Sequence, residues 1–490
     1  MAWYDVAVLA LHFLLLSALC LFGLHRLSML FRWFSHRNDQ ATPLSRYNDL
    51  PAMTVQIPVY NERYVAQRII DAVAQLRYPQ GKLQIQIVDD STDSTYDAIA
   101  ERVRHHQQQG VNIQHVHRTD RSGFKAGALK EAMEHASGEF IAIFDADFVP
   151  DPDILMDNVH YFTDPSLGML QFRWEHLNRK NSQLTELQSI MLDAHFGLEQ
   201  RIRSGSGLFL NFNGTAGIWR KETIYDAGNW SADTLTEDLD LSYRAQLKGW
   251  KMQYLNHVPC PAEVPSDINA FKSQQHRWAK GGVEVMMKML GTVWKSPASL
   301  KHKLESTFHL SNNLAYLLLL IDTIFLLIPS IMVREQYQIE YIWWLDLPLL
   351  IASSLGHIIY LVFGQYALQR PMGKAFSNIP GLFLLGIQIS FNNARAACEA
   401  LFGHKTEFVR TPKSGELNEK QKTIKKIPRY KAVAPRGAII EAILSVVFTV
   451  LLFWCVEKEI WFMLPFMTFL IIGYITTSVS SFIHYQRLKS

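Results

Sequence analysis

Short apolar, β-branched runs alternate with segments of helical periodicity between residues 53 and 144. The runs have the length and composition of buried strands, and the segments between them place their apolar residues on one helical face. The predicted strands span residues 54–58, 83–88, 113–117 and 140–144. Strands that alternate with helices are typical of βαβ units. The pattern predicts a mainly parallel, Rossmann-like α/β domain, with bounds at residues 50–282.

Five apolar runs lie outside this domain, one at the N-terminus and four in the C-terminal third. A helix of about 20 apolar residues is long enough to cross a bilayer core of about 30 Å. The runs span residues 6–24, 314–333, 347–368, 438–456 and 460–483. They predict an anchor within residues 1–33, two transmembrane helices within 310–369 and a transmembrane hairpin at 437–484.

Two further apolar segments are predicted to lie on the membrane surface. Residues 283–294 are too short to cross a bilayer, which predicts an interfacial helix over 283–300. Residues 382–401 are interrupted by asparagine, arginine and glutamate in their second half, which predicts an amphipathic interfacial helix at 379–402.

Basic residues set the predicted orientation. Arg26, Arg32 and Arg37 follow the first apolar run, and the segment 403–436 is rich in Lys and Arg. A cleavable signal peptide carries its basic residues before the apolar core, so we predict an uncleaved anchor. Positive residues beside spanning helices stay in the cytoplasm. The sequence therefore predicts five crossings, with the N-terminus outside and the α/β domain, segment 403–436 and C-terminus in the cytoplasm.

Composition narrows the classes of partner. A net charge of +3 gives no reason to expect nucleic acid. The four cysteines are widely scattered, so they make neither a disulfide framework nor a metal site.

Two carboxylates, Asp145 and Asp147, directly follow the strand predicted at 140–144. Open α/β sheets bind their ligands at the carboxyl ends of the strands. Two acids at this place can share Mg²⁺ or Mn²⁺ with the diphosphate of a nucleotide sugar, although an acidic turn without a metal would have the same sequence. Polar residues also follow the other strands and favour a nucleotide site: Tyr60, Glu62, Asp89, Asp90, Arg121 and Lys125.

Each of these polar residues has an alternative role. Asp89 or Asp90 is a candidate acceptor of hydrogen bonds from the base or ribose, but an acidic residue here also fits a helix N-cap. Arg121 and Lys125 are candidates for phosphate contacts, and solvation at the surface explains them nearly as well.

Two later clusters are candidates for the transfer step itself. Asp238, with Glu237 as the second choice, is a candidate general base for an acceptor sugar hydroxyl, although an acidic helix start would look alike. Arg277 offers a fixed fork for phosphate oxygens, and Trp278 offers a flat face for a sugar ring. A basic amphipathic helix on a membrane would resemble this second cluster.

These clusters occur in the order Asp90, Asp145-Ala146-Asp147, Thr236-Glu237-Asp238 and Gln274-x-x-Arg277-Trp278. The series resembles the D, DxD, TED, QxxRW motifs of processive family-2 glycosyltransferases. That family includes cellulose synthase, the cellulose synthase-like glucan and mannan synthases and curdlan synthase. The resemblance covers residues 54–412, and HFGLEQ at 195–200 and FNGTAG at 212–217 are similar to the cellulose synthase-like group.

The resemblance implies a GT-A domain with Asp238 as the base and Trp278 stacked on the acceptor at the mouth of a transmembrane channel. Segment 408–413, FVRTPK, is similar to the FxVTxK gating loop of bacterial cellulose synthase, with Arg410 in place of valine. The candidate donor-binding residues are Tyr60, Glu62, Asp89, Asp90, Arg121, Lys125, Asp145, Gln274, Arg277, Thr411 and Lys413. The candidate acceptor-binding residues are Trp278, Asn213 and Gly214.

The expected function is a membrane-embedded, inverting, processive β-glycosyltransferase that polymerises a hexose into a β-glucan or β-mannan and moves the chain across the membrane. UDP-glucose is the favoured donor and GDP-mannose the alternative. The expected partners are a growing polysaccharide, membrane lipids, and accessory subunits or further copies of the chain. A non-processive lipid glycosyltransferase, similar to ceramide glucosyltransferase, is the second hypothesis, and a transporter or receptor with a degenerate nucleotide site is the third.

Asp322 and Glu441 stand inside predicted spans, where a charge in contact with lipid is costly. Each is therefore expected to face protein or water. For Asp322, a polysaccharide path and an interhelical hydrogen bond remain equal alternatives.

Overall fold

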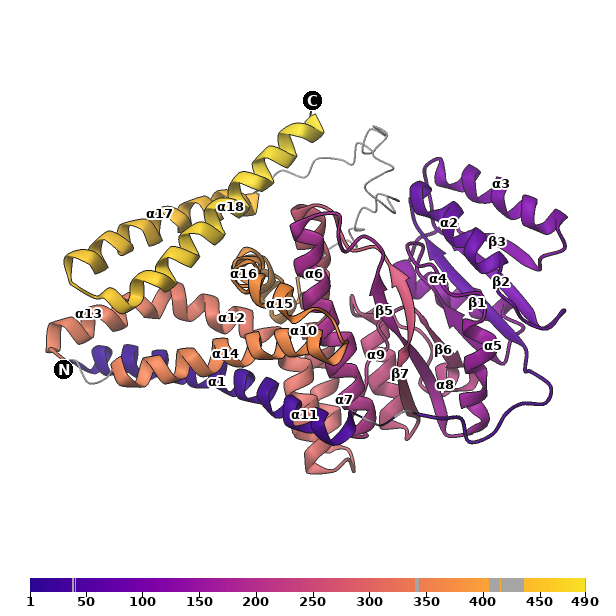
Figure 1. Ribbon diagram of the computed structural model, residues 1–490, viewed down its shortest axis with the longest axis horizontal. Coiled ribbons are helices and arrows are strands. Elements are labelled where there is room, and N and C mark those ends of the chain that lie inside the picture. Colours follow the sequence, from indigo (N-terminus) through magenta and orange to yellow (C-terminus); the bar gives the residue numbers. More distant parts are fainter. Residues whose placement is uncertain (38, 40, 340–342, 405–414, 416–435, 490) are drawn as a thin grey trace.

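The computed structural model describes residues 1–490 except 38, 40, 340–342, 405–414, 416–435 and 490. It joins an α/β domain to a bundle of long helices that extends away from it (Figure 1). The N-terminus lies at the end of the bundle that is far from the α/β domain.

A seven-stranded mixed sheet forms the centre of the α/β domain, in the order β3-β2-β1-β4-β6-β5-β7. Strands β1 to β4 are parallel, and β6 is antiparallel to both of its neighbours. The strands are β1 Met53–Val59, β2 Leu83–Asp89, β3 Ile113–His117, β4 Phe140–Ile143, β5 Leu167–His176, β6 Gly217–Arg220 and β7 Lys251–Ala262. The α/β class and the first four strands agree with the sequence prediction, whereas β5, β6 and β7 were not predicted.

Helices cover both faces of the sheet. On one face lie α2 (Arg63–Ala74) and α3 (Thr95–Gln108), and on the other lie α4 (Phe124–Ala132), α8 (Lys221–Asp226) and α9 (Glu237–Leu247). Strand residues alternate between these layers. Ile87 of β2 packs with α2 and α3, whereas Val88 packs with Ala128 and Ala132 of α4.

A group of helices connects the sheet to the bundle. They are α6 Gln183–Asp193, the π-helical turn η3 Ala194–Glu199, α7 Gln200–Gly205, α10 Ile268–Lys295, α11 Leu300–Ser311, α15 Met372–Ser377 and α16 Ile379–Leu401. The short helix α5 (Ile154–Asn158) packs instead on the sheet, with α2 and α3. Helix α10 is continuous, so the segment predicted as a separate interfacial helix from residue 283 is its second half, and the predicted domain boundary at residue 282 falls inside it. Helix α16 packs against α10.

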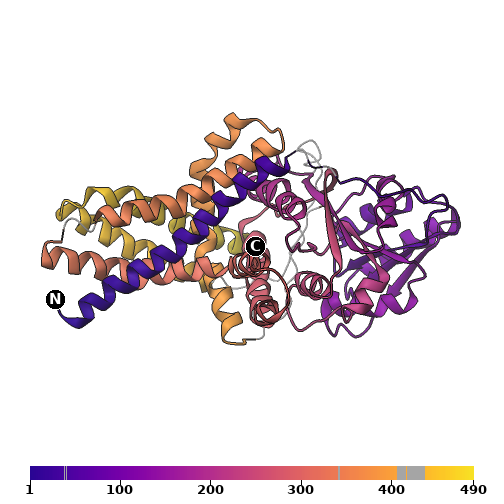
Figure 2. The same cartoon turned by 90° about the horizontal axis from the view of Figure 1, so that it is seen from below.

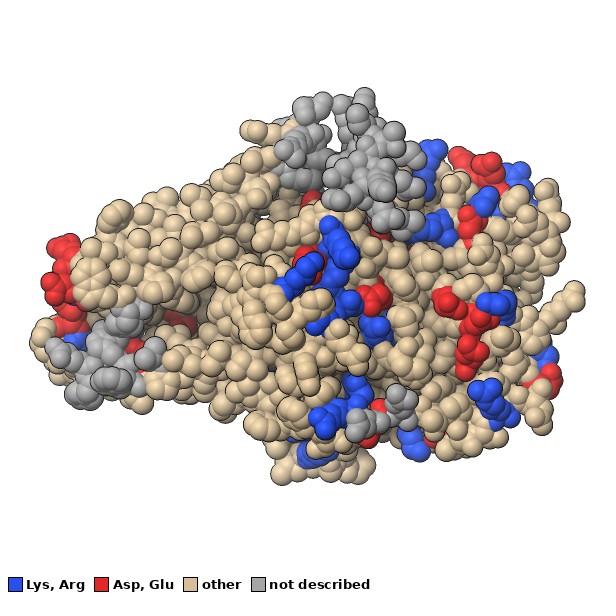
Figure 3. Space-filling model, viewed as in Figure 1, with Lys and Arg blue, Asp and Glu red and all other residues tan. Residues whose placement is uncertain are grey.

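Within the described residues, five helices are long and apolar enough to cross a membrane. They are α1 Trp3–His36, the helix Leu314–Tyr337, α14 Trp343–Ala367, α17 Arg436–Glu457 and α18 Leu464–Lys489. The second consists of α12 Leu314–Ile321, the π-helical turn η4 Asp322–Leu326 and α13 Leu327–Tyr337. Helix α1 lies beside α14 (Figure 2). The face of the bundle in Figure 3 shows almost no charged residues between its tip and the α/β domain.

The acidic residues inside these helices contact other parts of the protein. Asp322 accepts a hydrogen bond from His12 Nδ1 at 2.8 Å, and His12 Nε2 lies 3.2 Å from Asp346 Oδ1. The interhelical bond is thus the alternative that the structure supports for Asp322. Glu441 of α17 pairs with Lys272 of α10, so it faces protein as expected.

Candidate active site

One cleft at the carboxyl ends of β1, β2 and β4 brings together most of the residues singled out in the sequence. The loops after these strands, the start of α9 and the middle of α10 form its walls. The predicted residues that line it are Tyr60, Glu62, Asp90, Arg121, Lys125, Asp145, Asp147, Asn213, Gly214, Glu237, Asp238, Gln274, Arg277 and Trp278. Thr411 and Lys413 lie outside the described residues.

Asp89 and Asp90 separate at the end of β2. Asp90 lines the cleft and accepts two hydrogen bonds of 2.7 Å from the buried guanidinium of Arg118, which the sequence analysis did not single out. Asp89 lies outside the cleft, and its carboxylate accepts the Ser91 backbone N–H at 2.9 Å and contacts His115 at 2.8 Å. The expectation that Asp89 binds the donor is therefore corrected, because consecutive residues of a strand point to opposite layers.

Neither aspartate is a helix N-cap. The N-cap residue of α3 is Ser94, and the Asp93 side chain accepts the backbone N–H of Thr95 at 2.9 Å. Asp90 therefore stays available as a cleft residue, held in place by Arg118.

Tyr60 and Arg121 form a stacked pair on the wall of the cleft. The guanidinium carbon of Arg121 lies 3.4 Å from the centre of the Tyr60 ring. A cation over an aromatic face is electrostatically favourable, and the pair offers a flat surface to a ligand.

Lys125 connects the acidic loop after β4 to the loop before β6. Its Nζ donates to Asp145 Oδ1 at 2.6 Å and to the Gly214 carbonyl at 2.9 Å. Burial lowers the pKa of Lys125, but Asp145, Glu237 and Asp238 outweigh burial and raise it. The ammonium is therefore a fixed positive charge in the cleft.

Asp145 and Asp147 fit a hard divalent cation. Both line the cleft, and the loop that carries them is fixed by two hydrogen bonds. Asp145 N donates to Thr215 Oγ1 at 2.7 Å, and the Asp147 carbonyl accepts from Arg68 Nη2 at 3.1 Å. Carboxylate oxygens are the donors that Mg²⁺ and Mn²⁺ prefer.

The acidic pair at the start of α9 is partly buried in the same cleft. Burial, followed by the neighbouring charge of Glu237, raises the pKa of Asp238 to about 7. Burial also raises the pKa of Glu237. A carboxylate whose pKa lies near neutral pH is well matched to accept a proton from a sugar hydroxyl.

Gly214 leaves room for this carboxylate. Its φ is +79°, and a Cβ there would lie 2.9 Å from Asp238 Oδ2. A side chain at this position is therefore disfavoured both by the backbone conformation and by contact with the candidate base.

Aromatic rings line the side of the cleft formed by α10. The Trp278 ring centre lies 6.5 Å from that of Trp174 on β5, which stacks on Phe196 at 4.7 Å. Trp174 also lines the cleft but was not identified from the sequence, because its strand was not predicted. Such faces suit the apolar faces of sugar rings.

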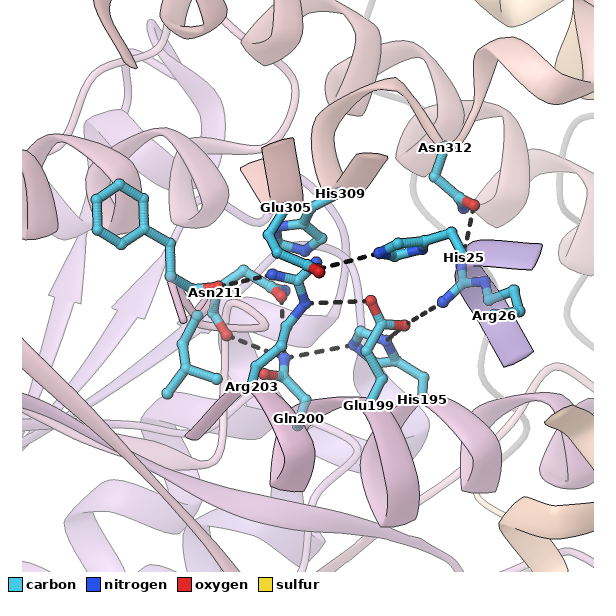
Figure 4. Close-up of polar contacts among 12 residues, drawn as sticks. His25, Arg26, His195, Glu199, Gln200, Arg203, Asn211, Glu305, His309 and Asn312 are labelled. Atoms are coloured by element: carbon cyan, nitrogen blue, oxygen red, sulfur yellow. Dashed lines mark hydrogen bonds and ion pairs between the residues drawn. The ribbon is translucent and has the colours of Figure 1, made fainter. Parts of the chain in front are cut away.

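A polar network connects Asn213 of the cleft to the first long helix, and Figure 4 shows its part from His195 through Glu199 to Arg26. Asn213 Oδ1 contacts His195 Nε2 at 3.1 Å, and His195 Nδ1 lies 3.3 Å from Glu199 Oε2. The same oxygen accepts from Arg26 Nη1 of α1 at 2.8 Å, while Arg203 Nε donates to Oε1 at 3.3 Å. Burial raises the pKa of Glu199, but the facing Arg26 and His195 hold it well below its usual range.

Comparisons with known proteins identify the family and the fold. The sequence profile of the family described as "Glycosyltransferase like family 2" matches residues 51–281. Glucomannan 4-beta-mannosyltransferase 9 of Arabidopsis thaliana is 34% identical over 404 residues, which are 78% of this chain and 71% of that protein. The chain belongs to glycosyltransferase family 2. Glucomannan 4-beta-mannosyltransferase 1 of Oryza sativa subsp. japonica is 42% identical over 261 residues.

This family-2 chain spans about half the length of several of these relatives, including the rice protein, where 50% of each chain is covered. Among solved structures, a mannosyltransferase from Pyrobaculum calidifontis, in complex with GDP-Man and Mn²⁺, is 18% identical and has a TM-score of 0.53. That alignment covers 81% of this chain and all of the archaeal chain. With the mixed sheet, it identifies the α/β domain as a GT-A-like domain.

Proposed function

We propose that this chain is an inverting, processive β-mannosyltransferase that builds a mannan from GDP-mannose. The observation that carries the proposal is the partly buried Asp238, whose pKa is raised to about 7, in one cleft with the acidic pair Asp145 and Asp147 and with Trp278. The names of the curated relatives support mannose as the sugar. GDP-mannose, which is bound in the archaeal structure of similar fold, replaces UDP-glucose, the donor that the sequence analysis favoured.

The cleft offers a group for each part of the reaction. Asp238 accepts the proton of the acceptor hydroxyl while the hydroxyl oxygen attacks C1 of the α-linked donor. The bond from C1 to the phosphate oxygen breaks at the same time, so the product is β-linked. Trp278 and Trp174 orient the acceptor, and Lys125 and Arg277 face the leaving diphosphate. Mg²⁺ or Mn²⁺ held by Asp145 and Asp147 would neutralise the charge of that diphosphate.

The bundle supports action at a membrane. Five helices in the described part of the chain have the length and composition to cross it. The basic residues beside them, from Arg26 onward and within 403–436, favour the cytoplasm for the α/β domain. GDP-mannose would then be used inside and the polysaccharide secreted. Accessory subunits or further copies of the chain remain part of this proposal.

The experiment is radiolabel incorporation by membranes that contain the protein. GDP-mannose and UDP-glucose are offered separately with Mg²⁺ or Mn²⁺, and the product is digested with linkage-specific glycanases. We expect a high-molecular-weight, mannanase-sensitive product from GDP-mannose, lost in Asp238→Asn and retained in Asp97→Asn, a surface change on α3. Label found only in solvent-extractable lipid would replace the polymerase with the lipid glycosyltransferase.

A further inference from the structure

A second group of ligand-type side chains lies on the other layer of the sheet, outside the cleft. Asp89 of β2 stands opposite His117 of β3 in the parallel register, and Ile87 stands opposite His115. The two histidines are two residues apart on an edge strand, so their side chains share one face with Asp89.

The three side chains already converge on one point. His115 Nε2 lies 2.8 Å and His117 Nδ1 3.4 Å from Asp89 Oδ2, and one donor atom from each residue lies within 4.8 Å of the other two. Asp89 Oδ1 accepts the Ser91 N–H, which fixes the carboxylate with Oδ2 toward the imidazoles. The Tyr96 ring of α3 packs on both histidines, at 5.0 and 4.7 Å between centres.

We propose that Asp89, His115 and His117 bind a transition-metal ion of the Zn²⁺ type, separate from the cation of the cleft. Metal–ligand bonds of about 2.0–2.2 Å in tetrahedral geometry place donor atoms about 3.3 Å apart. The observed 2.8 and 3.4 Å lie on either side of that value, so small side-chain rotations suffice. Two imidazole nitrogens exclude Mg²⁺ as the preferred ion, because Mg²⁺ selects oxygen donors.

The site has an entry path and a second shell. The His117 side chain is 30% exposed, whereas the Asp89 side chain is fully buried, so an ion enters from the His117 side and solvent fills the remaining position. The backbone N–H of Ser91 on the far carboxylate oxygen orients the ligand in the way that second-shell partners of metal ligands do.

The ion would stiffen the floor of the donor site. Asp90 follows Asp89 and Arg118 follows His117, and these two form the buried ion pair of the cleft on the opposite layer. A metal that ties β2 to the edge strand β3 therefore fixes the strand ends that carry this pair. We expect metal loading to raise the thermal midpoint of the full chain even without donor.

The test uses the full chain, purified in detergent without a polyhistidine tag, stripped with a chelator and held in excess Mg²⁺ to occupy sites made of oxygen donors. Co²⁺ titration is expected to give visible d–d absorption that saturates at about one ion per chain and disappears on addition of Zn²⁺. His115→Gln and His117→Gln should each weaken this binding at least tenfold. The control is His105→Gln, which changes an exposed histidine of α3.

Two outcomes overturn the proposal. One is the absence of a saturable Co²⁺ spectrum in the unaltered chain, which needs no variant and so does not depend on variant folding. The other is Zn²⁺ binding, measured by elemental analysis after desalting, that both histidine variants retain at the strength of the control. The proposed mannosyl transfer would survive either result, since its residues lie in the cleft.

Discussion

Adding a methyl group at Gly281 of α10 should displace the candidate base, Asp238, relative to the rest of the cleft. A Cβ there would lie 2.6 Å from Thr236 Cγ2 and 2.9 Å from Thr236 N. Thr236 immediately precedes Glu237 and Asp238, and its backbone has no rotamer by which to move away. Gly281→Ala must therefore push the start of α9 away from α10. Gly291 of the same helix is a matched control, because a Cβ there has no such neighbour within 4 Å.

The size of the effect follows from two opposing contributions. Overpacking costs about 1–3 kcal/mol, and replacing a helical glycine with alanine returns about 1 kcal/mol. Gly281→Ala should thus destabilise the chain by about 0–2 kcal/mol, while Gly291→Ala stabilises it by about 1 kcal/mol. Activity should fall much more, since a misplacement of about 1 Å costs roughly 10²-fold in rate.

The assay combines mannose incorporation per folded protein with the thermal midpoint in detergent. We expect the rate of Gly281→Ala to fall roughly 10²-fold at 25 °C, where the protein remains folded. Retention of more than half the rate, in a protein as stable as the Gly291→Ala control, would refute the reasoning.

Three further predictions concern charge. Because Asp238 must be ionised to act as a base and its pKa is about 7, kcat/KM should rise about tenfold per pH unit below pH 7 and level off above it; a flat profile from pH 5 to 8 would contradict this role. Glu199→Gln removes the negative charge that pairs with Arg26 and with the fully buried Arg203. It should lower the free energy of unfolding, measured with denaturant, by about 3–5 kcal/mol. The control Glu101→Gln, at an exposed position, should change it by less than about 0.5 kcal/mol. Asp147→Asn should raise the Mn²⁺ concentration for half-maximal rate at least about tenfold, and an unchanged requirement would exclude Asp147 as a ligand.

The sequence predicted the first half of the sheet well because β1, β2 and β4 are buried on both faces, and because the half-exposed edge strand β3 follows a helical segment in the same strand–helix alternation. Strands β5 and β7 do not read as short apolar runs. Strand β5 carries Gln171, Arg173 and Glu175, and β7 carries Pro259 and Pro261. Proline disfavours a central strand but is tolerated on an edge, and β7 is the edge strand that pairs with β5 alone among the described strands.

The sequence identified the site residues that belong to motifs. It missed the residues that only contacts between distant segments bring to the site. Arg118 is the residue after β3, and its two hydrogen bonds to the cleft residue Asp90 could be known only from the structure. The error on Asp89 was avoidable, since the strand period of two already separates it from Asp90. Trp174 could not be found before its strand was known. The predicted domain boundary at residue 282 falls inside helix α10 because apolar residues become more frequent after that point, although the helix itself continues to Lys295.

The hydrogen bonds of His12 also set an order of events during synthesis. Its partners Asp322 and Asp346 follow 310 and 334 residues later along the chain. At about 5–20 residues per second, a ribosome needs roughly 15–60 s to reach the first of them. In the proposed topology, α1 enters the bilayer with a polar side chain that waits for its acceptors while the whole α/β domain is made and folds beneath the membrane. The helices between Leu314 and Ala367 therefore pack on α1 after the α/β domain has been made, and α1 acts as their template.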